Sequence, residues 1–152
     1  MHPIFEVYMK LVTRLYEGYE KTLEGLSIEA LDWTSGPDMN SLCVQVVHIT
    51  GSTRFLMGEL VGGIPANRDR ASEFRASGFT EAALKARLAE SREFVRGVLD
   101  KLTLDELTVA HPFPSGDETF TYAEMILHVL DHTGLHLGHA QITRQLWDQQ
   151  HG

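Results

Sequence analysis

Four of the eight histidines of this 152-residue chain lie in one stretch, His128-Val129-Leu130-Asp131-His132-Thr133-Gly134-Leu135-His136-Leu137-Gly138-His139. In a helix each residue turns by about 100° and rises by about 1.5 Å, so the four imidazoles would share a stripe roughly 80° wide. Histidines at positions i and i+4 of a helix are spaced so that two ring nitrogens can reach one metal ion. We therefore expect a helix that carries part of a metal site.

The segments before this stretch predict three further helices. Apolar residues recur every three or four positions from about residue 4 to residue 24, and Gly25 ends the pattern. Asn40 or Ser41 can cap a second helix that runs to about Val61. Thr80 can cap a third helix with the narrow apolar seam typical of bundle packing. The seam consists of Leu84, Leu88, Ser91, Val95, Val98 and Leu102.

The last helix and the connections complete the fold prediction. Thr121 and Glu124 have the spacing of a capping box, which opens a helix from about Tyr122 to Trp147. Just before it, a turn at 114–117 between short extended segments favours a hairpin or an extended loop. Residues 62–78 show no periodic pattern and predict a long middle loop. The sequence thus predicts an all-α four-helix bundle that forms one domain over residues 1–152.

Composition and charge narrow the range of functions. The formal net charge is -8, which argues against general nucleic-acid binding because that needs clustered Lys and Arg. No apolar run approaches the ~20 residues of a membrane span, and the first residues lack the pattern of a signal peptide. The single cysteine, Cys43, excludes an internal disulfide and fits a reducing compartment. We expect a cytoplasmic protein that binds a small molecule, a metal or another protein.

Spacing alone leaves the choice of metal ligands open. His128 and His136 would be about 12 Å apart along the helix axis and cannot share an ion, whereas the pairs 128/132, 132/136 and 136/139 can. A third ligand has to come from another helix. His48 is the candidate, because small residues such as Gly51 and Ser52 leave space beside its ring. For any one of these histidines, a hydrogen-bonded imidazole on a half-buried face is the alternative.

The layout resembles the DinB/YfiT-like family of four-helix-bundle metalloproteins, also described as the damage-inducible family. The resemblance covers nearly the whole chain. It rests on the second-helix segment Asn40–His48, on the arginine-containing middle loop and above all on Asp131–Gln141. Members of the family bind a divalent metal through one histidine of the second helix and an HxxxH pair of the last. The resemblance therefore implies His48, His132 and His136 as ligands, with His128 and His139 as neighbours of the site.

A site of this kind suggests catalysis. Three neutral imidazoles leave the charge of a divalent ion uncompensated and at least one coordination position open, as in catalytic zinc sites. Zn, Ni and ferrous Fe all suit such ligands. An ion with an open coordination position can lower the pKa of a bound water or deprotonate a bound thiol. Characterised members of the resembled family include transferases that use low-molecular-weight thiols such as bacillithiol or mycothiol. The resemblance thus implies a thiol-dependent S-transferase that acts on a small electrophile.

Two other functions stay open. One is a metal-dependent hydrolase of a small molecule, although Thr133 follows His132 where a zincin-type peptidase has its general-base glutamate. The other is a non-catalytic, dimeric metal-binding module of a stress response. A homodimer is implied by the resemblance and by the apolar last helix, which carries Gly134 and Gly138. Because each glycine costs a helix about 1 kcal/mol relative to alanine, we expect another helix or a ligand close to them.

The middle loop offers a possible cofactor contact. Arg68 and Arg70 could hold the carboxylates of a thiol cofactor. The alternative is that the arginines of this loop pair with Asp69 and Glu73 in solvent. The sequence singles out no catalytic residue.

Overall fold

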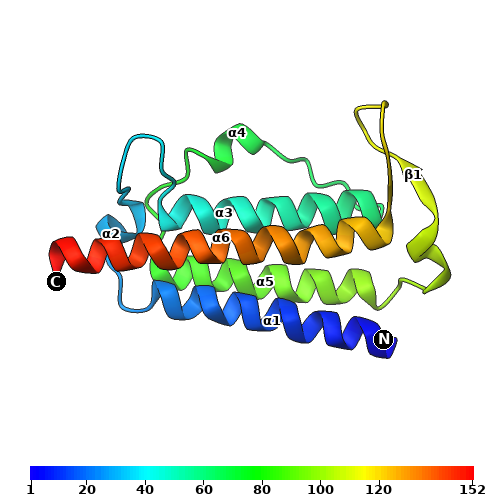
Figure 1. Ribbon diagram of the computed structural model, residues 1–152, viewed down its shortest axis with the longest axis horizontal. Coiled ribbons are helices and arrows are strands. Elements are labelled where there is room, and N and C mark those ends of the chain that lie inside the picture. Colours follow the sequence, from blue (N-terminus) through cyan, green and yellow to red (C-terminus); the bar gives the residue numbers. More distant parts are fainter.

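The computed structural model of the protein describes residues 1–152, and four long helices dominate it (Figure 1). They are α1 (Pro3–Leu23), α3 (Leu42–Thr53), α5 (Glu81–Leu99) and α6 (Tyr122–His151), and α3 continues into the π-helical segment η1 (Arg54–Val61). The short helices α2 (Ile28–Asp32), α4 (Arg70–Glu73) and η2 (Asp105–Thr108) lie in the connections. Two strands, β1 (Ala110–Pro112) and β2 (Thr119–Thr121), form an antiparallel hairpin before α6. The predicted all-α four-helix bundle is confirmed.

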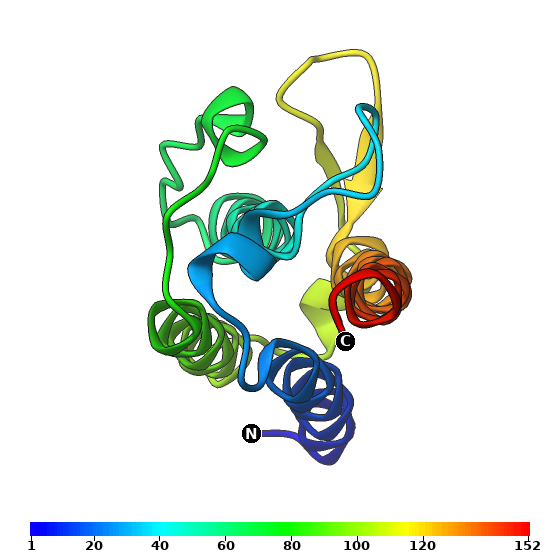
Figure 2. The ribbon, with the colours of Figure 1, turned by 90° about the vertical axis from the view of Figure 1, so that its left-hand side faces the viewer.

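The four long helices stand at the corners of a square (Figure 2). α1 and α3 lie at opposite corners, and each packs against both α5 and α6. α1 and α6 run in one direction along the bundle, whereas α3 and α5 run in the other (Figure 1). Because α3 and α5 are parallel, the chain between them has to return along the length of the bundle. This return explains the long middle loop, which passes outside α3 and carries α4 (Figure 1).

Local capping sets the helix ends, as predicted. The side chains of Ser41 and Thr80 each accept a hydrogen bond from the backbone N–H three residues further on. Thr121 and Glu124 form the predicted capping box at the start of α6. Gly25 follows α1 with a φ of +73°, a left-handed conformation that favours glycine.

The second long helix differs from the prediction in its last turns. It reaches Val61, as expected, but from Arg54 onward its backbone has the wider turns of a π-helix. Accordingly, the N–H of Gly62 donates to the carbonyl of Met57, five residues earlier, at 2.9 Å. Inside this segment, a Cβ on Gly58 would lie 2.7 Å from Cζ of Phe94. The wider turns thus coincide with a close contact between η1 and α5.

Gly18 makes a close contact between α1 and α6. A Cβ on Gly18 would lie 2.7 Å from Cδ2 of Leu137. Gly134, by contrast, has only Leu15 nearby, at 3.9 Å, and Gly138 faces open space. Within this chain, no other helix therefore comes closer than ordinary contact to either glycine, and a ligand or a dimer contact at them stays a prediction. The small residue at the contact belongs to α1.

Tyrosines of α1 fill part of the core. Tyr16 and Tyr19 are 1% and 0% exposed. The hydroxyl of Tyr16 shares a hydrogen bond of 2.8 Å with the hydroxyl of Ser91 on α5. The hydroxyl of Tyr19 has no partner. Since a buried polar group without a partner costs stability, the two tyrosines contribute differently to the core.

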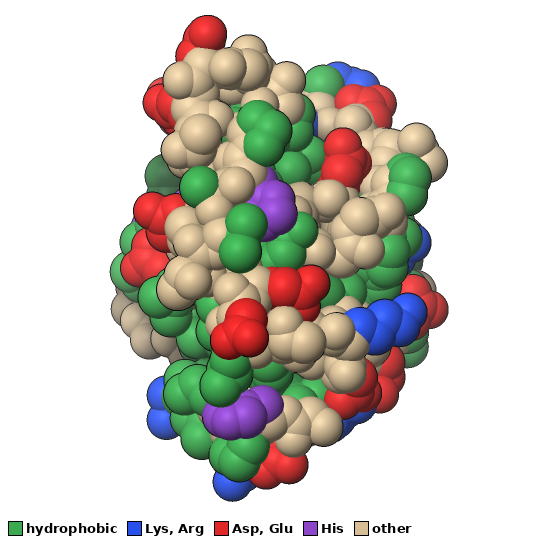
Figure 3. Space-filling view, turned by 90° about the vertical axis from the view of Figure 1, so that its right-hand side faces the viewer, with side chains coloured by type: hydrophobic (Ala, Val, Ile, Leu, Met, Phe, Trp, Pro, Cys, Tyr) green, Lys and Arg blue, Asp and Glu red, His purple; other side chains and the backbone are tan.

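The end of the bundle that carries the hairpin presents apolar side chains between acidic ones (Figure 3). Between α1 and the start of α6, a groove of about 260 Å³ is lined entirely by apolar residues, among them Ile4, Val7 and Leu127. None of the helices combines the length and the apolar character that a membrane crossing requires.

Candidate metal centre

His48 on α3 meets His132 and His136 on α6 where these two antiparallel helices pack together. Each histidine offers one ring nitrogen to a cluster in which the three atoms lie within 4.8 Å of one another. Nε2 of His48 lies 3.3 Å from Nε2 of His132. His48 is buried, whereas His132 and His136 keep part of their surface exposed. The structure thus brings together the three histidines that the resemblance implies, in a cluster whose two α6 histidines are partly exposed.

The cluster fits a divalent metal ion. Two nitrogen ligands that each lie about 2.1 Å from one tetrahedral ion are roughly 3.4 Å apart. The separation of the His48 and His132 nitrogens matches that spacing. Nδ1 of His136 is buried without a hydrogen-bond partner, so no hydrogen bond at this atom compensates for its burial. The three histidines could therefore hold a metal ion.

A carboxylate holds the other nitrogen of the His48 ring. Nδ1 of His48 lies 2.9 Å from Oε2 of Glu73, at the end of α4. Arg68 donates to both oxygens of this carboxylate, from Nε to Oε1 at 2.7 Å and from Nη2 to Oε2 at 2.9 Å. Glu73 itself is only 5% exposed. Histidine ligands of metal sites commonly donate their second N–H to a carboxylate in this way.

Two further residues shape the surroundings of His48. Gly51, on α3 like His48, provides the space that the Glu73 carboxylate fills, because a Cβ on Gly51 would overlap Oε1 of that carboxylate. Phe74 packs against the His48 ring, with the two ring centroids 4.7 Å apart. Arg70 in turn lies over Phe74, 5.1 Å from its ring centroid. The middle loop is therefore packed against the histidine cluster.

Burial and mutual repulsion keep the imidazoles uncharged at neutral pH. Burial, with added repulsion from the neighbouring imidazoles, lowers the pKa of both His132 and His136 to about 4. Burial also lowers the pKa of His48, although the Glu73 carboxylate acts in the opposite direction. Burial would raise the pKa of Glu73, but hydrogen bonds from Arg68 and His48 outweigh it and hold this pKa below its usual range. Neutral rings are the form that binds metal ions.

The other two histidines of the last helix flank the cluster. His128 stacks on His132, and His139 lies edge-on to His136, in each case with ring centroids 5.6 Å apart. Both flanking rings are exposed. Neither belongs to the group whose nitrogens converge.

Sequence reasoning missed Glu73 as a residue of the site. Glu73 lies in the segment without periodicity, and pairing with an arginine in solvent was the alternative for that segment. The structure pairs it with Arg68 out of solvent instead. The available signal was Gly51, which faces the same side of the helix as His48 and indicates the close approach of another group. A cofactor-binding role of Arg68 and Arg70 stays a prediction.

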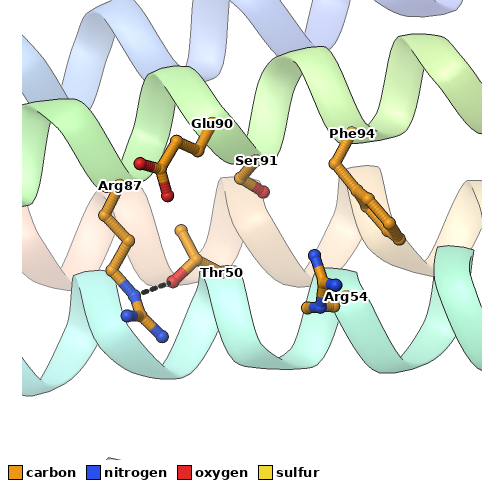
Figure 4. Close-up of a pocket in the computed structure, with 6 residues that line it drawn as sticks. All are labelled: Thr50, Arg54, Arg87, Glu90, Ser91 and Phe94. Atoms are coloured by element: carbon orange, nitrogen blue, oxygen red, sulfur yellow. Dashed lines mark hydrogen bonds between the residues drawn. The ribbon is translucent and has the colours of Figure 1, made fainter. Parts of the chain in front are cut away.

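A polar cavity lies between α3 and α5 (Figure 4). Its volume is about 130 Å³, and its lining includes two arginines, Arg54 and Arg87. Arg87 donates from Nε to the hydroxyl of Thr50 at 2.7 Å, and Arg54 lies 4.5 Å from the ring centroid of Phe94 (Figure 4). No histidine lines this cavity, which is therefore distinct from the candidate metal centre.

The bundle and the cluster define a helical protein with a candidate three-histidine metal centre. Residues 11–140 match the DinB superfamily. The chain belongs to this superfamily, which confirms the family that the sequence resembles. The fold is also similar to that of a conserved protein from Enterococcus faecalis known from a crystal structure, with a TM-score of 0.81 and 15% identity over 98% of this chain and 99% of that chain. No curated protein matches the sequence.

Proposed function

We propose that the protein is a metal-dependent enzyme that transfers a low-molecular-weight thiol to a small electrophile. The convergence of three imidazole nitrogens within 4.8 Å carries this proposal. His48, His132 and His136 would hold the ion, and Zn, Ni or ferrous Fe all suit these ligands. When bound by neutral ligands alone, such an ion supplies Lewis acidity that favours the thiolate form of a thiol.

The thiol has to come from outside the chain. Cys43 is buried, and burial together with the nearby Asp32 raises its pKa to about 11, so it does not supply a thiolate at neutral pH. In the proposed reaction the sulfur of an external thiol forms a bond to an electrophilic carbon. The leaving group departs with the electron pair of the broken bond, and the thiol proton is released. Arg70 and Nη1 of Arg68 are the candidates to bind carboxylates of the thiol, because Nε and Nη2 of Arg68 already donate to Glu73.

The surroundings of the cluster favour thiol transfer over hydrolysis. Hydrolysis by a metal-bound water is helped by a general base that takes a proton from that water. The oxygens of Glu73 already accept hydrogen bonds from Arg68 and His48. Thr133, which follows His132 in the chain, is only 2% exposed and has no acidic group. Neither Glu73 nor Thr133 therefore offers a free carboxylate for this role, which supports thiol transfer.

Metal analysis of the purified protein tests the site. Elemental mass spectrometry should find about one divalent ion per chain in the wild type, and much less in His48→Ala, His132→Ala and His136→Ala. His128→Ala and His139→Ala are matched controls, because these rings lie beside the cluster but outside it, and they should keep the metal. Unchanged metal content in all three ligand variants would rule out the triad.

A thiol-transfer assay tests the reaction. The metal-loaded protein is incubated with monochlorobimane and with bacillithiol, mycothiol or glutathione, and formation of the thioether is followed by fluorescence. We expect acceleration with one of the thiols, and its loss in His132→Ala. A metal-loaded protein that is inactive with all three thiols would favour a hydrolase or a non-catalytic binding module.

We further propose that the protein forms a homodimer through α6. Leu127, Leu135 and Ile142 are 64%, 57% and 53% exposed, and their spacing places them within a stripe roughly 80° wide. Exposed apolar residues on one side of a helix support a contact with a second copy of the chain. Light scattering should give twice the chain mass for the wild type and the monomer mass for Leu135→Lys. A monomeric wild type would contradict the proposal.

The lone buried cysteine suits the cytoplasm, which we propose as the location.

A further inference from the structure

We propose that Glu73 is a positioning residue, which fixes the His48 imidazole in the tautomer and orientation that metal binding requires. The inference rests on the proposed metal centre. It assigns a role to the end of α4, which lies outside the four-helix bundle (Figure 1), and to the ion pair between Glu73 and Arg68.

The hydrogen-bond pattern determines the tautomer of His48. The carboxylate of Glu73 can only accept hydrogen bonds, so Nδ1 of His48 carries the proton in their 2.9 Å contact. A neutral imidazole has one protonated nitrogen, which leaves the lone pair of His48 on Nε2. Nε2 is also the atom that lies 3.3 Å from Nε2 of His132. Glu73 therefore selects the tautomer whose lone pair points into the cluster.

The carboxylate is itself held in place. Arg68 binds both of its oxygens, a two-point contact that leaves Glu73 little freedom to rotate. The side chains of His48 and Glu73 are 6% and 7% exposed, so water competes little for their hydrogen bond. The negative charge of Glu73 beside Nδ1 also makes Nε2 a stronger electron-pair donor to a metal ion. The fixed orientation of His48 and the charge of Glu73 therefore both strengthen metal binding at Nε2.

Gly51 provides an independent way to test the contact. A Cβ on Gly51 would overlap Oε1 of Glu73, so Gly51→Ala should push the carboxylate away from His48 without removing any charge. Alanine is a better helix former than glycine, so the substitution does not weaken α3 itself. Gly97, on α5, has nothing within 4 Å of its Cβ position. Gly97→Ala is therefore the matched control.

Zinc titration of the full-length protein measures the effect on binding. We expect Glu73→Ala to raise the Kd for Zn²⁺ by about 10- to 100-fold, the range seen when such supporting carboxylates are removed. Glu73→Gln should have a smaller effect, because its amide oxygen can still accept the Nδ1 hydrogen although the charge is lost. Gly51→Ala should weaken binding in the same direction. Gly97→Ala and Glu29→Ala, an exposed glutamate on α2, should bind like the wild type.

A second measurement needs no metal and separates positioning from a general effect on folding. Two-bond proton–nitrogen NMR spectra of the chelated protein report the tautomer of each histidine. His48 should have its proton on Nδ1 in the wild type and lose this preference in Glu73→Ala and Gly51→Ala, while the tautomer of His111, on β1, stays unchanged. Thermal unfolding of each variant verifies that it is folded.

The two hypotheses fail in different ways. If the wild type does not bind Zn²⁺, or if His132→Ala binds it equally well, the metal centre itself is wrong. If the wild type binds, His132→Ala does not, and the Glu73 and Gly51 variants keep both the wild-type Kd and the wild-type tautomer, only the role of Glu73 is wrong. Weaker binding with an unchanged tautomer would also overturn the positioning role.

Discussion

Nε2 of His48 and Nε2 of His132 lie 3.3 Å apart, although 84 positions separate the two residues in the chain. The contact exists only in the folded protein. In the unfolded chain each imidazole is surrounded by water and takes up a proton near pH 6.5. Folding therefore changes the proton affinity of the cluster, which links the stability of the protein to pH.

The free energy of unfolding of the chelated protein should fall as the pH is lowered from about 6.5 to about 4. The pKa of His132 and His136 in the folded protein is about 4, below the unfolded value, so the unfolded state binds more protons in this window. Each of the two histidines adds up to about 1.4 kcal/mol per pH unit to the slope. Urea unfolding at several pH values measures it. The double variant His132→Asn/His136→Asn should show a shallower slope, and equal slopes would contradict the assignment.

Metal binding should stabilise the folded protein. An ion that binds only the native state at a free concentration of 100 times its Kd adds about 2.7 kcal/mol to the free energy of unfolding. Thermal unfolding with Zn²⁺ should therefore show a higher Tm, which a chelator returns to its starting value. His136→Ala should show no such response. An equal rise in this variant would mean that zinc binds elsewhere.

Gly18→Ala and Gly138→Ala should have opposite effects on stability. Alanine favours a helix by about 1 kcal/mol relative to glycine, and Gly138 has open space for the added methyl group. At Gly18 the methyl group meets Leu137, and overpacking of this kind costs about 1–3 kcal/mol. Urea unfolding should thus show Gly138→Ala as more stable than the wild type and Gly18→Ala as less stable. A gain in both variants would mean that α1 and α6 pack less closely than the structure indicates.

Tyr19→Phe and Tyr16→Phe should also differ. The hydroxyl of Tyr19 is buried without a partner, so its removal should stabilise the protein by about 1 kcal/mol. Removal of the Tyr16 hydroxyl breaks the hydrogen bond to Ser91 and should cost about 1–2 kcal/mol. Both substitutions remove the same hydroxyl group, so the difference between their effects on stability reports the difference in hydrogen bonding. Equal effects in urea unfolding would show that the hydroxyl of Tyr19 does have a partner in solution.

Local signals made most of the fold predictable. The caps at Ser41, Thr80 and Thr121 depend on residues within one turn, so the sequence predicts them directly. The direction of the helices depends on packing between distant segments, and the return of the chain from η1 to α5 did not follow from the sequence. The π-helical turns after Arg54 escaped prediction because apolar periodicity does not distinguish the two kinds of helix at that length.

Part of the candidate site was also predictable, because it depends on a local sequence pattern. Histidines four residues apart on one helix form a local pattern, and the resemblance to a family selected His132 and His136 from it. Glu73 reaches His48 from a loop, and no spacing rule connects the two residues. The glycines of α6 did not identify the close contact between helices. The close contact between α1 and α6 occurs at Gly18 of α1, which lies against Leu137.

The position of α4 has a consequence for how proteins with this architecture can diverge. The histidines belong to α3 and α6, whose packing holds the bundle together, so few changes around them leave the fold intact. The carboxylate that touches His48 comes from a connection outside the bundle, and the first three residues of α4 are exposed. In the proposed metal centre, a change in the length or sequence of this connection would alter the affinity for the ion while leaving the four long helices unchanged. If the proposal for Glu73 holds, metal affinity and fold therefore depend on different parts of the chain.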